Sequence, residues 1–271
     1  MGMPICATCG VESDIALTTC PICADERRYI PAGGQVWVNL EDAASIPYDL
    51  TVRRVEPKLF SLHREPTFAT GYWSMLVQTD RGNLLWDPLN FLDGKVVDRV
   101  RRLGGVDAIA ASHPHTFGAQ VSWSHAFNHA PVWVNSDDMN WLLRRDPVIR
   151  PWSGTQVVLP AVELVQCGGH FPGSAVLHWQ HGCSGRGVLL TGDTVADATA
   201  DGHVAFLRSH ANRIPLSGAV IERIVRRLEA YDYERLYSSN GVGVYRDAKR
   251  AVRRSADNYI CSILEDLDAG P

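Results

Sequence analysis

The sequence has no apolar stretch long enough to cross a bilayer and no excess of positive charge. A membrane-spanning helix needs about 20 mostly apolar residues, and no run in these 271 residues approaches that length. The formal net charge is −4, so the chain carries no basic field that would attract a polyanion. We therefore expect no contact with membranes and no nucleic-acid partner.

The first residues also lack the charged and apolar regions of a secretion signal. The chain has seven cysteines, an odd number, and three of them (Cys167, Cys183 and Cys261) are scattered along the sequence. Extracellular proteins usually pair their cysteines in disulfides, whereas a reducing compartment leaves thiols free or bound to metals. We therefore expect a cytoplasmic protein with one cysteine-bound metal and three free thiols.

The other four cysteines form two CxxC pairs near the N-terminus. Cys6 and Cys9 make the first pair, Cys20 and Cys23 the second, and ten residues separate them. Four thiolates at this spacing suit a tetrahedral zinc ion, with iron as the alternative soft metal. We predict a zinc ribbon over residues 1–30 with a structural role, because metal binding can replace the missing apolar core. Free thiols, two disulfides or a redox-active pair are the alternatives.

Beyond residue 30 the sequence alternates between patterns typical of strands and of helices. Apolar runs at residues 72–78 and 83–87 flank a Thr-Asp-Arg-Gly turn and predict a hairpin. Hydrophobic spacing predicts helices at 96–103, 119–129, 217–230 and 246–267, and another helix that begins near residue 136. It also predicts strands at 106–111, at 131–135 and near 236, and several strands between 155 and 190. We therefore expect residues 31–271 to form an α/β sandwich with helices outside its sheets.

Four histidine and aspartate side chains lie where predicted strands end, and a fifth lies in a turn. Asp87 ends one apolar strand and Asp193 another, while His113 and His115 follow a third. His170 lies in a turn-rich segment between glycines. Imidazoles and carboxylates at the ends of rigid strands can converge on one zinc or iron ion.

These motifs resemble those of the metallo-β-lactamase superfamily. The matches are the strand-end Asp87, the H-x-H of His113 and His115, the G-H-x-P-G-S around His170 and the G-D at Asp193. The resemblance implies an αββα sandwich with metal in the cleft between two sheets. It also implies that His113, His115 and His170 bind the first metal, that Asp193 is a ligand or bridge, and that Asp87 supports the ligands.

The sequence departs from the family pattern where the second metal would bind. The family continues its motif as H-x-H-x-D-H, whereas this chain has Phe117 and Gly118 at the last two positions. The usual C-terminal histidine is replaced by Asn240. We therefore predict one metal in the cleft and not two. Asp193 then becomes the candidate to orient the attacking water.

One zinc with an open position can supply hydroxide near neutral pH, but the two-ion clamp that suits phosphodiester cleavage is missing. We predict a hydrolase that uses a mononuclear metal-bound hydroxide on a small organic substrate, such as an activated ester, ether, lactone or thioester. An alternative is a mononuclear iron oxygenase in which His113, His170 and Asp193 form the ligand triad. Another is a non-catalytic binding or assembly subunit with a degenerate site. A rubredoxin-linked electron-transfer protein ranks last, because its cysteine pairs are more widely spaced.

A few further residues are candidates for roles near the cleft. His125 lies ten residues after His115, and we name it with Asp193 as a catalytic candidate that could reach the vacant second-metal position; packing of its helix is the alternative. His203 and His210 lie in a loop that shapes the substrate pocket in the family. We expect the ribbon to dock either a second copy of the chain or a partner subunit.

Overall fold

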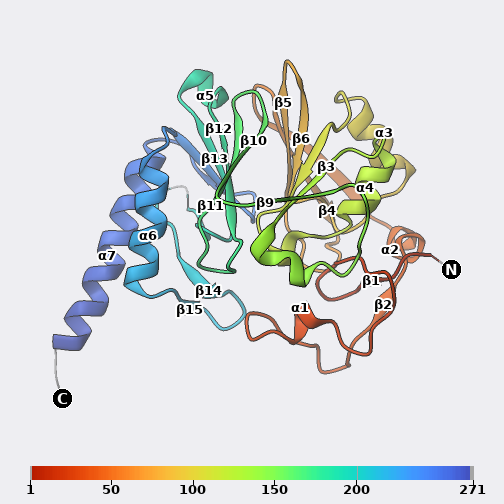
Figure 1. The fold of residues 1–271 in the computed structure, drawn as a ribbon, viewed down its shortest axis with the longest axis horizontal. Coiled ribbons are helices and arrows are strands. Elements are labelled where there is room, and N and C mark those ends of the chain that lie inside the picture. The colour runs from red at the N-terminus through yellow and green to blue at the C-terminus, as the bar shows by residue number, and fades with distance from the viewer. Residues whose placement is uncertain (1, 200, 269–271) are drawn as a thin grey trace.

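Two β-sheets pack face to face in the computed structural model of this chain, and helices cover both outer faces (Figure 1). The structure describes residues 2–199 and 201–268. The predicted α/β sandwich is confirmed. Among the helices of these residues, none combines the length and apolar character that a membrane crossing requires.

The two sheets are formed by successive halves of the chain. The first sheet has seven strands, in spatial order β3 (Asp49–Glu56), β4 (Leu59–Glu65), β5 (Ser74–Thr79), β6 (Gly82–Trp86), β7 (Ala108–Ala110), β8 (Val132–Asn135) and β9 (Ile149–Trp152). The second has six, β10 (Thr155–Leu159), β11 (Val162–Gln166), β12 (Ala175–Trp179), β13 (Val188–Gly192), β16 (Arg235–Ser238) and β17 (Gly243–Val244). The predicted hairpin is β5–β6, which pairs Gln78 with Asn83.

Four helices form the outer layers of the sandwich. They are α3 (Gly94–Arg101) and α4 (Gln120–Ala126) on the first sheet and α6 (Gly218–Glu229) and α7 (Ala248–Asp268) on the second. The shorter elements are β1 (Ile5–Cys6), α1 (Pro21–Ala24), β2 (Trp37–Val38), α2 (Leu40–Ser45), η1 (Pro114–Thr116), η2 (Ser136–Trp141), α5 (Gly182–Gly185), β14 (Leu207–Ser209) and β15 (Ile214–Pro215).

Alternation along the strands explains why the sandwich has three separate apolar cores. In β6, Leu84 and Trp86 face the second sheet, while Leu85 packs with the helices outside the first. In β13, Leu190 faces the first sheet and Leu189 packs under the outer helices. Successive side chains point to opposite faces of a sheet, and both faces are buried here. The strands therefore appear in the sequence as continuous apolar runs.

The helices begin and end close to the predicted positions, with two differences. α4 ends at Ala126, three residues earlier than predicted, because Asn128 and His129 take positive φ angles of 53° and 56°. The helix predicted near residue 136 is wrong as an α-helix: η2 is a 3₁₀ helix of six residues that ends where Leu142 becomes extended.

The four N-terminal cysteines lie in a small module that is tied to the rest of the chain. We use N-terminal module for residues 2–38, because β1 pairs with β2 through Ile5–Val38 and Cys6–Trp37. This pairing joins residues on either side of the boundary predicted at residue 30. Figure 1 shows the module along the edge of the sandwich, from the neighbourhood of α2 to that of β14 and β15.

A buried carboxylate fixes the module to the first layer of helices. Glu12 is 2% exposed, and its carboxylate accepts hydrogen bonds from the backbone N–H groups of Val121 and Ser122 in the first turn of α4. Arg144 Nη1 lies 2.5 Å from Glu12 Oε2. The carboxylate thus satisfies helix N–H groups that have no partner within the helix. The N-terminal module is therefore packed against the sandwich.

Candidate functional site

Three histidines and one aspartate meet at one edge of the two sheets. His113 and His115 follow β7, His170 lies between β11 and β12, and Asp193 directly follows β13. One potential ligand atom of each lies within 4.8 Å of those of the others. All four side chains are at most 2% exposed. The structure therefore brings together the four residues that the sequence nominated as cleft ligands.

The loop after β7 is held by a chain of hydrogen bonds that begins at Asp87. Asp87 Oδ1 accepts a hydrogen bond from the backbone N–H of Ser112 at 2.6 Å, and Ser112 Oγ donates to Asp87 Oδ2 at 3.1 Å. The same hydroxyl lies 2.8 Å from His113 Nδ1. Asp87 therefore acts on His113 through Ser112. A Cβ on Gly192 would lie 2.1 Å from Ser112 Oγ, so only glycine lets Asp193 approach this loop.

His170 is oriented by the loop that carries β14. Its Nδ1 lies 3.1 Å from the carbonyl oxygen of Leu207, so this nitrogen carries the proton and donates. Its Nε2 then has a free lone pair and lies 3.1 Å from His115 Nδ1. A ligating histidine commonly donates its other ring N–H in this way, which fixes both tautomer and ring direction.

The carboxylate of Asp193 is the point on which the other groups converge. Its Oδ2 lies 3.2 Å from His113 Nε2 and 3.9 Å from His170 Nε2. Tyr72 Oη donates to the same oxygen at 3.1 Å, and Ser239 Oγ donates to Oδ1 at 2.5 Å. These two hydroxyls therefore fix the orientation of the carboxylate.

Burial and the repulsion of neighbouring imidazoles lower the pKa values of His115 and His170. Burial, followed by the charge of His113, lowers the pKa of His170 to about 3 and that of His115 well below its ordinary value. Burial alone would raise the pKa of Asp193, but the imidazoles of His113 and its neighbours hold it well below the usual range. Neutral imidazoles and an ionised carboxylate are the protonation states in which these groups bind metals.

His210 is a fifth member of the site. From the sequence we expected only that it would lie in a loop that shapes the substrate pocket. It lies between β14 and β15, and its Nε2 is 3.4 Å from Asp193 Oδ2. Its side chain is 23% exposed, and its Nε2 has no hydrogen-bond partner. No motif surrounds it in the sequence, so only the folded loop reveals the contact.

The structure does not bring His125 to this cluster. Its Nε2 lies 3.0 Å from Asp146 Oδ2, and its ring packs on that of His129 with centroids 4.7 Å apart. The side chain is 37% exposed. His203 is also exposed, 3.8 Å from Asp201.

The positions that depart from the family pattern offer no metal ligand in this arrangement. Phe117 is buried. Gly118 has a φ of +51°, and a Cβ there would lie 2.8 Å from the carbonyl oxygen of Pro88. Asn240 is exposed, and its side-chain oxygen accepts hydrogen bonds from Ser238 and Val242. Backbone geometry thus prevents a histidine at position 118.

The four N-terminal cysteines form a second cluster of potential ligands. Cys6 Sγ lies 3.6 Å from Cys23 Sγ, and Cys9 Sγ lies 3.7 Å from Cys20 Sγ. A disulfide would require about 2.05 Å, whereas four sulfurs held about 2.3 Å from a tetrahedral zinc lie about 3.8 Å apart. All four are buried as free thiols. Their spacing therefore fits a four-sulfur metal site.

The N-terminal module also reaches the histidine cluster. We call residues 25–28 the roof segment. Its Arg27 lies over Phe171, with Cζ 4.3 Å from the ring centroid, and its Arg28 lies over Tyr72 at 5.7 Å. Phe171 packs against His115, with centroids 4.9 Å apart. The roof segment therefore covers aromatic side chains that contact the candidate ligands.

Comparison with known proteins agrees with this geometry. A sequence model described as the metallo-beta-lactamase superfamily matches residues 68–239, a span that contains all four clustered residues. The chain belongs to this superfamily. The superfamily match leaves out the N-terminal module. A curated relative, the uncharacterized protein YmaE of Bacillus subtilis, is 40% identical over 268 residues and covers 97% of each chain.

Solved structures of the superfamily share the fold at low sequence identity. The VMB-1 structure has a TM-score of 0.59 at 10% identity, covering 79% of this chain and 98% of that one. The DIM-1 metallo-beta-lactamase gives 0.57 at 11%, covering 79% and 100%. A B3 metallo-beta-lactamase described as having an active-site glutamic acid gives 0.53 at 16%, covering 83% and 96%. These likenesses concern the fold alone.

Proposed function

We propose that this protein is a hydrolase that works with one metal ion in the cleft and acts on a small organic substrate, such as an activated ester, ether, lactone or thioester. The observation that supports this most directly is the gathering of three imidazoles and one carboxylate, all buried, with ligand atoms within 4.8 Å of one another. Superfamily membership agrees with it.

The residues present fit a divalent cation. His113 Nε2 is buried without a hydrogen-bond partner, although it lies 3.2 Å from Asp193 Oδ2. A buried polar atom of this kind costs free energy unless something binds it. His113, His115, His170 and Asp193 would hold the ion. When bound, it would lower the pKa of a coordinated water to about 7 and polarise the substrate's reacting oxygen.

The protein's own groups would orient the reaction. Tyr72 and Ser239 hold the carboxylate of Asp193 in one position, so that it can direct a water molecule toward the substrate. We assign proton transfer to His210 in preference to His125. His210 is partly exposed and lies 3.4 Å from Asp193 Oδ2, whereas His125 is paired with Asp146. An acid–base group must be within reach of the reacting atoms.

An iron oxygenase remains the second candidate, because His113, His170 and Asp193 form a two-histidine, one-carboxylate set with Nε2-to-Oδ2 distances of 3.2 and 3.9 Å. The presence of His115 as a fourth ligand favours the hydrolase. A coloured, iron-containing protein that consumes oxygen would support the oxygenase.

For the cysteine cluster we propose zinc, on the sulfur spacing given above. We propose a reducing, cytoplasmic setting as well, since none of the seven cysteines forms a disulfide.

The test combines metal analysis with a substrate panel. Purified full-length protein is assayed with p-nitrophenyl acetate, a γ-lactone and a thioester, beside His170→Ala and the matched control His125→Ala. We expect metal-dependent hydrolysis that falls at least about a hundredfold in His170→Ala, the size of effect typical of catalytic groups, and stays within about twofold in His125→Ala. Full activity in the chelated protein, or in His170→Ala, would reject the proposal.

A further inference from the structure

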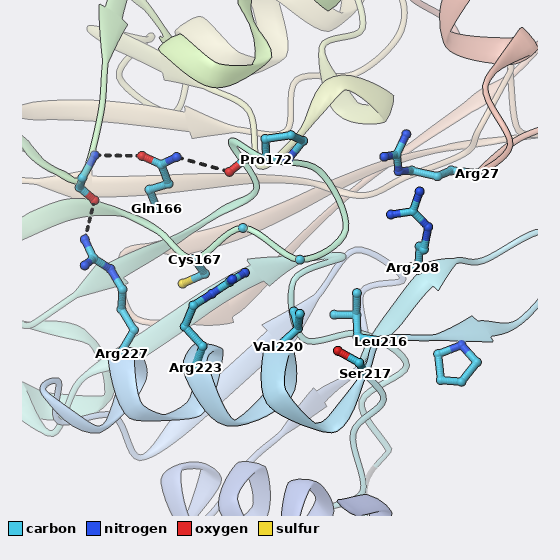
Figure 2. Close-up of a pocket in the computed structure, with 14 residues that line it drawn as sticks. Arg27, Gln166, Cys167, Pro172, Arg208, Leu216, Ser217, Val220, Arg223 and Arg227 are labelled. Carbon is cyan, nitrogen blue, oxygen red and sulfur yellow. Dashed lines mark hydrogen bonds between the residues drawn. The ribbon is translucent and has the colours of Figure 1, made fainter. Parts of the chain in front are cut away.

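A cavity of about 770 Å³ lies beside the loop that carries His170 (Figure 2). It is bounded by α6, by the start of that loop and by the roof segment. Its volume is in the range of small-molecule sites. None of His113, His115, His170 and Asp193 lines it, so it is separate from the candidate metal ligands.

The cavity is lined by positive charge without a carboxylate. Four of its 14 lining residues are arginines and none is aspartate or glutamate; the arginines are Arg27, Arg208, Arg223 and Arg227. One of the 14 is a thiol, Cys167, whose pKa is raised to about 12 by burial. It stays neutral at physiological pH. The protein therefore supplies no anion of its own inside the cavity.

Two of the four arginines are compensated by neighbours outside the cavity and two are not. Arg27 pairs with Asp25, and Arg208 pairs with Glu26. Within the described part of the chain, no carboxylate oxygen lies within 4.0 Å of a guanidinium nitrogen of Arg223 or Arg227, so neither forms an ion pair. Arg227 instead donates to the carbonyl oxygen of Gly154 at 2.8 Å. The cavity thus carries two uncompensated charges from α6.

Neighbouring arginines show that this lack of partners is local. On the same helix, Arg226 pairs with Glu222 at 2.6 Å. Arg253 of α7 pairs with Glu222 and Glu229, both at 2.7 Å. Arg226 and Arg253, which do not line the cavity, are therefore neutralised, whereas Arg223 and Arg227 have no carboxylate partner among the described residues.

The arginines lie at two ends of the cavity, with apolar side chains between them. Arg223 and Arg227 are one turn apart on α6, about 6 Å along the helix axis. Figure 2 shows Val220 and Leu216 between them and the opposite end, where Arg208 and Arg27 lie close together. The loop approaches the helix closely: a Cβ on Gly168 would lie 3.2 Å from Arg223 Nη2.

We propose that this cavity binds a small organic phosphate, with the phosphate on Arg223 and Arg227 and an apolar body across Val220 and Leu216. A phosphate dianion matches the two uncompensated charges, and guanidinium groups bind its oxygens in a fork-like, two-point geometry. Because the roof segment and the loop of His170 both border the cavity, such a ligand would also bridge the N-terminal module and the second layer of the sandwich.

Isothermal titration calorimetry of the full-length protein with phenyl phosphate tests this. We expect saturable binding that weakens as salt rises, and that is at least about tenfold weaker in Arg223→Ala and in Arg227→Ala, as expected for loss of a charge-assisted hydrogen bond. The matched control is Arg226→Ala, which removes an arginine of the same helix outside the cavity and is expected to leave affinity within about twofold. Circular dichroism confirms that each variant is folded.

Further titrations distinguish the contributions of the phosphate group and of the apolar body, and separate binding in the cavity from binding at the candidate metal site. Inorganic phosphate should bind more weakly than phenyl phosphate, and benzyl alcohol should not bind. Binding of phenyl phosphate should persist in Asp193→Asn, which changes the candidate metal site and leaves the cavity intact. The proposal is overturned if wild-type protein gives no binding at millimolar concentration, or if Arg223→Ala and Arg226→Ala bind alike. If Asp193→Asn loses binding while Arg223→Ala and Arg227→Ala keep it, the phosphate binds at the candidate metal site, and this result also overturns the proposal.

Discussion

Asp193 Oδ2 and His113 Nε2 lie 3.2 Å apart in the interior of the protein, and His113 Nε2 has no hydrogen-bond partner. The two residues come from different sheets, since Asp193 follows β13 and His113 follows β7. Sheet packing alone brings them together.

The two ligand clusters should bind metal independently. We expect about two ions per chain in the full-length protein, and about one in either His113→Ala or Cys20→Ser, because each substitution removes a ligand from one cluster. Elemental analysis by mass spectrometry measures this. Two ions in His113→Ala would show that His113 is not required to hold the ion and would contradict its assignment as a ligand. Point variants are preferable to deletion of residues 1–30, since Glu12 is buried against α4.

His210 should matter for turnover more than for metal content. His210→Ala should lower kcat by about a hundredfold, as expected for an acid–base group, with unchanged metal stoichiometry and a lost limb of the pH–rate profile. His125→Ala is the control, because its ring contacts Asp146. A profile identical to wild type would assign His210 a structural role only.

Asp87 should support metal binding through Ser112. Asp87→Ala removes the carboxylate that fixes Ser112, which in turn contacts His113. Loss of such an outer hydrogen bond typically weakens metal binding about 10–100-fold. Competition with a chelator measures the affinity. Asp80→Ala, in the exposed β5–β6 turn, should change nothing; equal effects in both variants would contradict the assignment.

Glu12 should anchor the N-terminal module. Removing one partner of a buried ion pair costs about 3–5 kcal/mol, and the Glu12 and Arg144 side chains are 2% and 10% exposed. We expect Glu12→Ala to lower the free energy of unfolding by an amount in that range, measured by urea denaturation. Asp98→Ala breaks an exposed pair with Arg101 and should cost less than about 1 kcal/mol.

The metal-free protein should lose stability in acid partly through His170. Its pKa falls from 6.5 to about 3 on folding, mainly because of burial. Between these values the unfolded chain binds more protons than the folded one, so the stabilisation is complete above pH 6.5 and declines as pH falls toward 3.

Comparison with His170→Gln isolates this contribution. The difference between the unfolding free energies of wild type and variant should change by up to about 1.4 kcal/mol per pH unit in that window. Chemical denaturation at several pH values, in the presence of chelator, gives the two curves. Parallel curves would mean that His170 titrates normally in the folded protein.

The candidate ligands could be predicted because each belongs to a local motif. The spacing of the two CxxC pairs identifies Cys6, Cys9, Cys20 and Cys23 as ligands. The glycines and apolar strands around His170 and Asp193 identify these two residues. Buried strands are continuous apolar runs, so the sandwich was predictable too. Near residue 136 the pattern failed, since η2 makes one short 3₁₀ helix where an α-helix was expected.

What the sequence by itself determined is therefore the set of local elements and the donor atoms that they carry. The tertiary structure alone decided that Tyr72 and Ser239 hold Asp193, that His210 joins the site, and that Arg27 meets Arg208 at one end of a cavity. The physical reason is the separation in sequence between the residues that interact. Periodicity and spacing record interactions between near neighbours in the chain, whereas these contacts arise only when distant segments pack together.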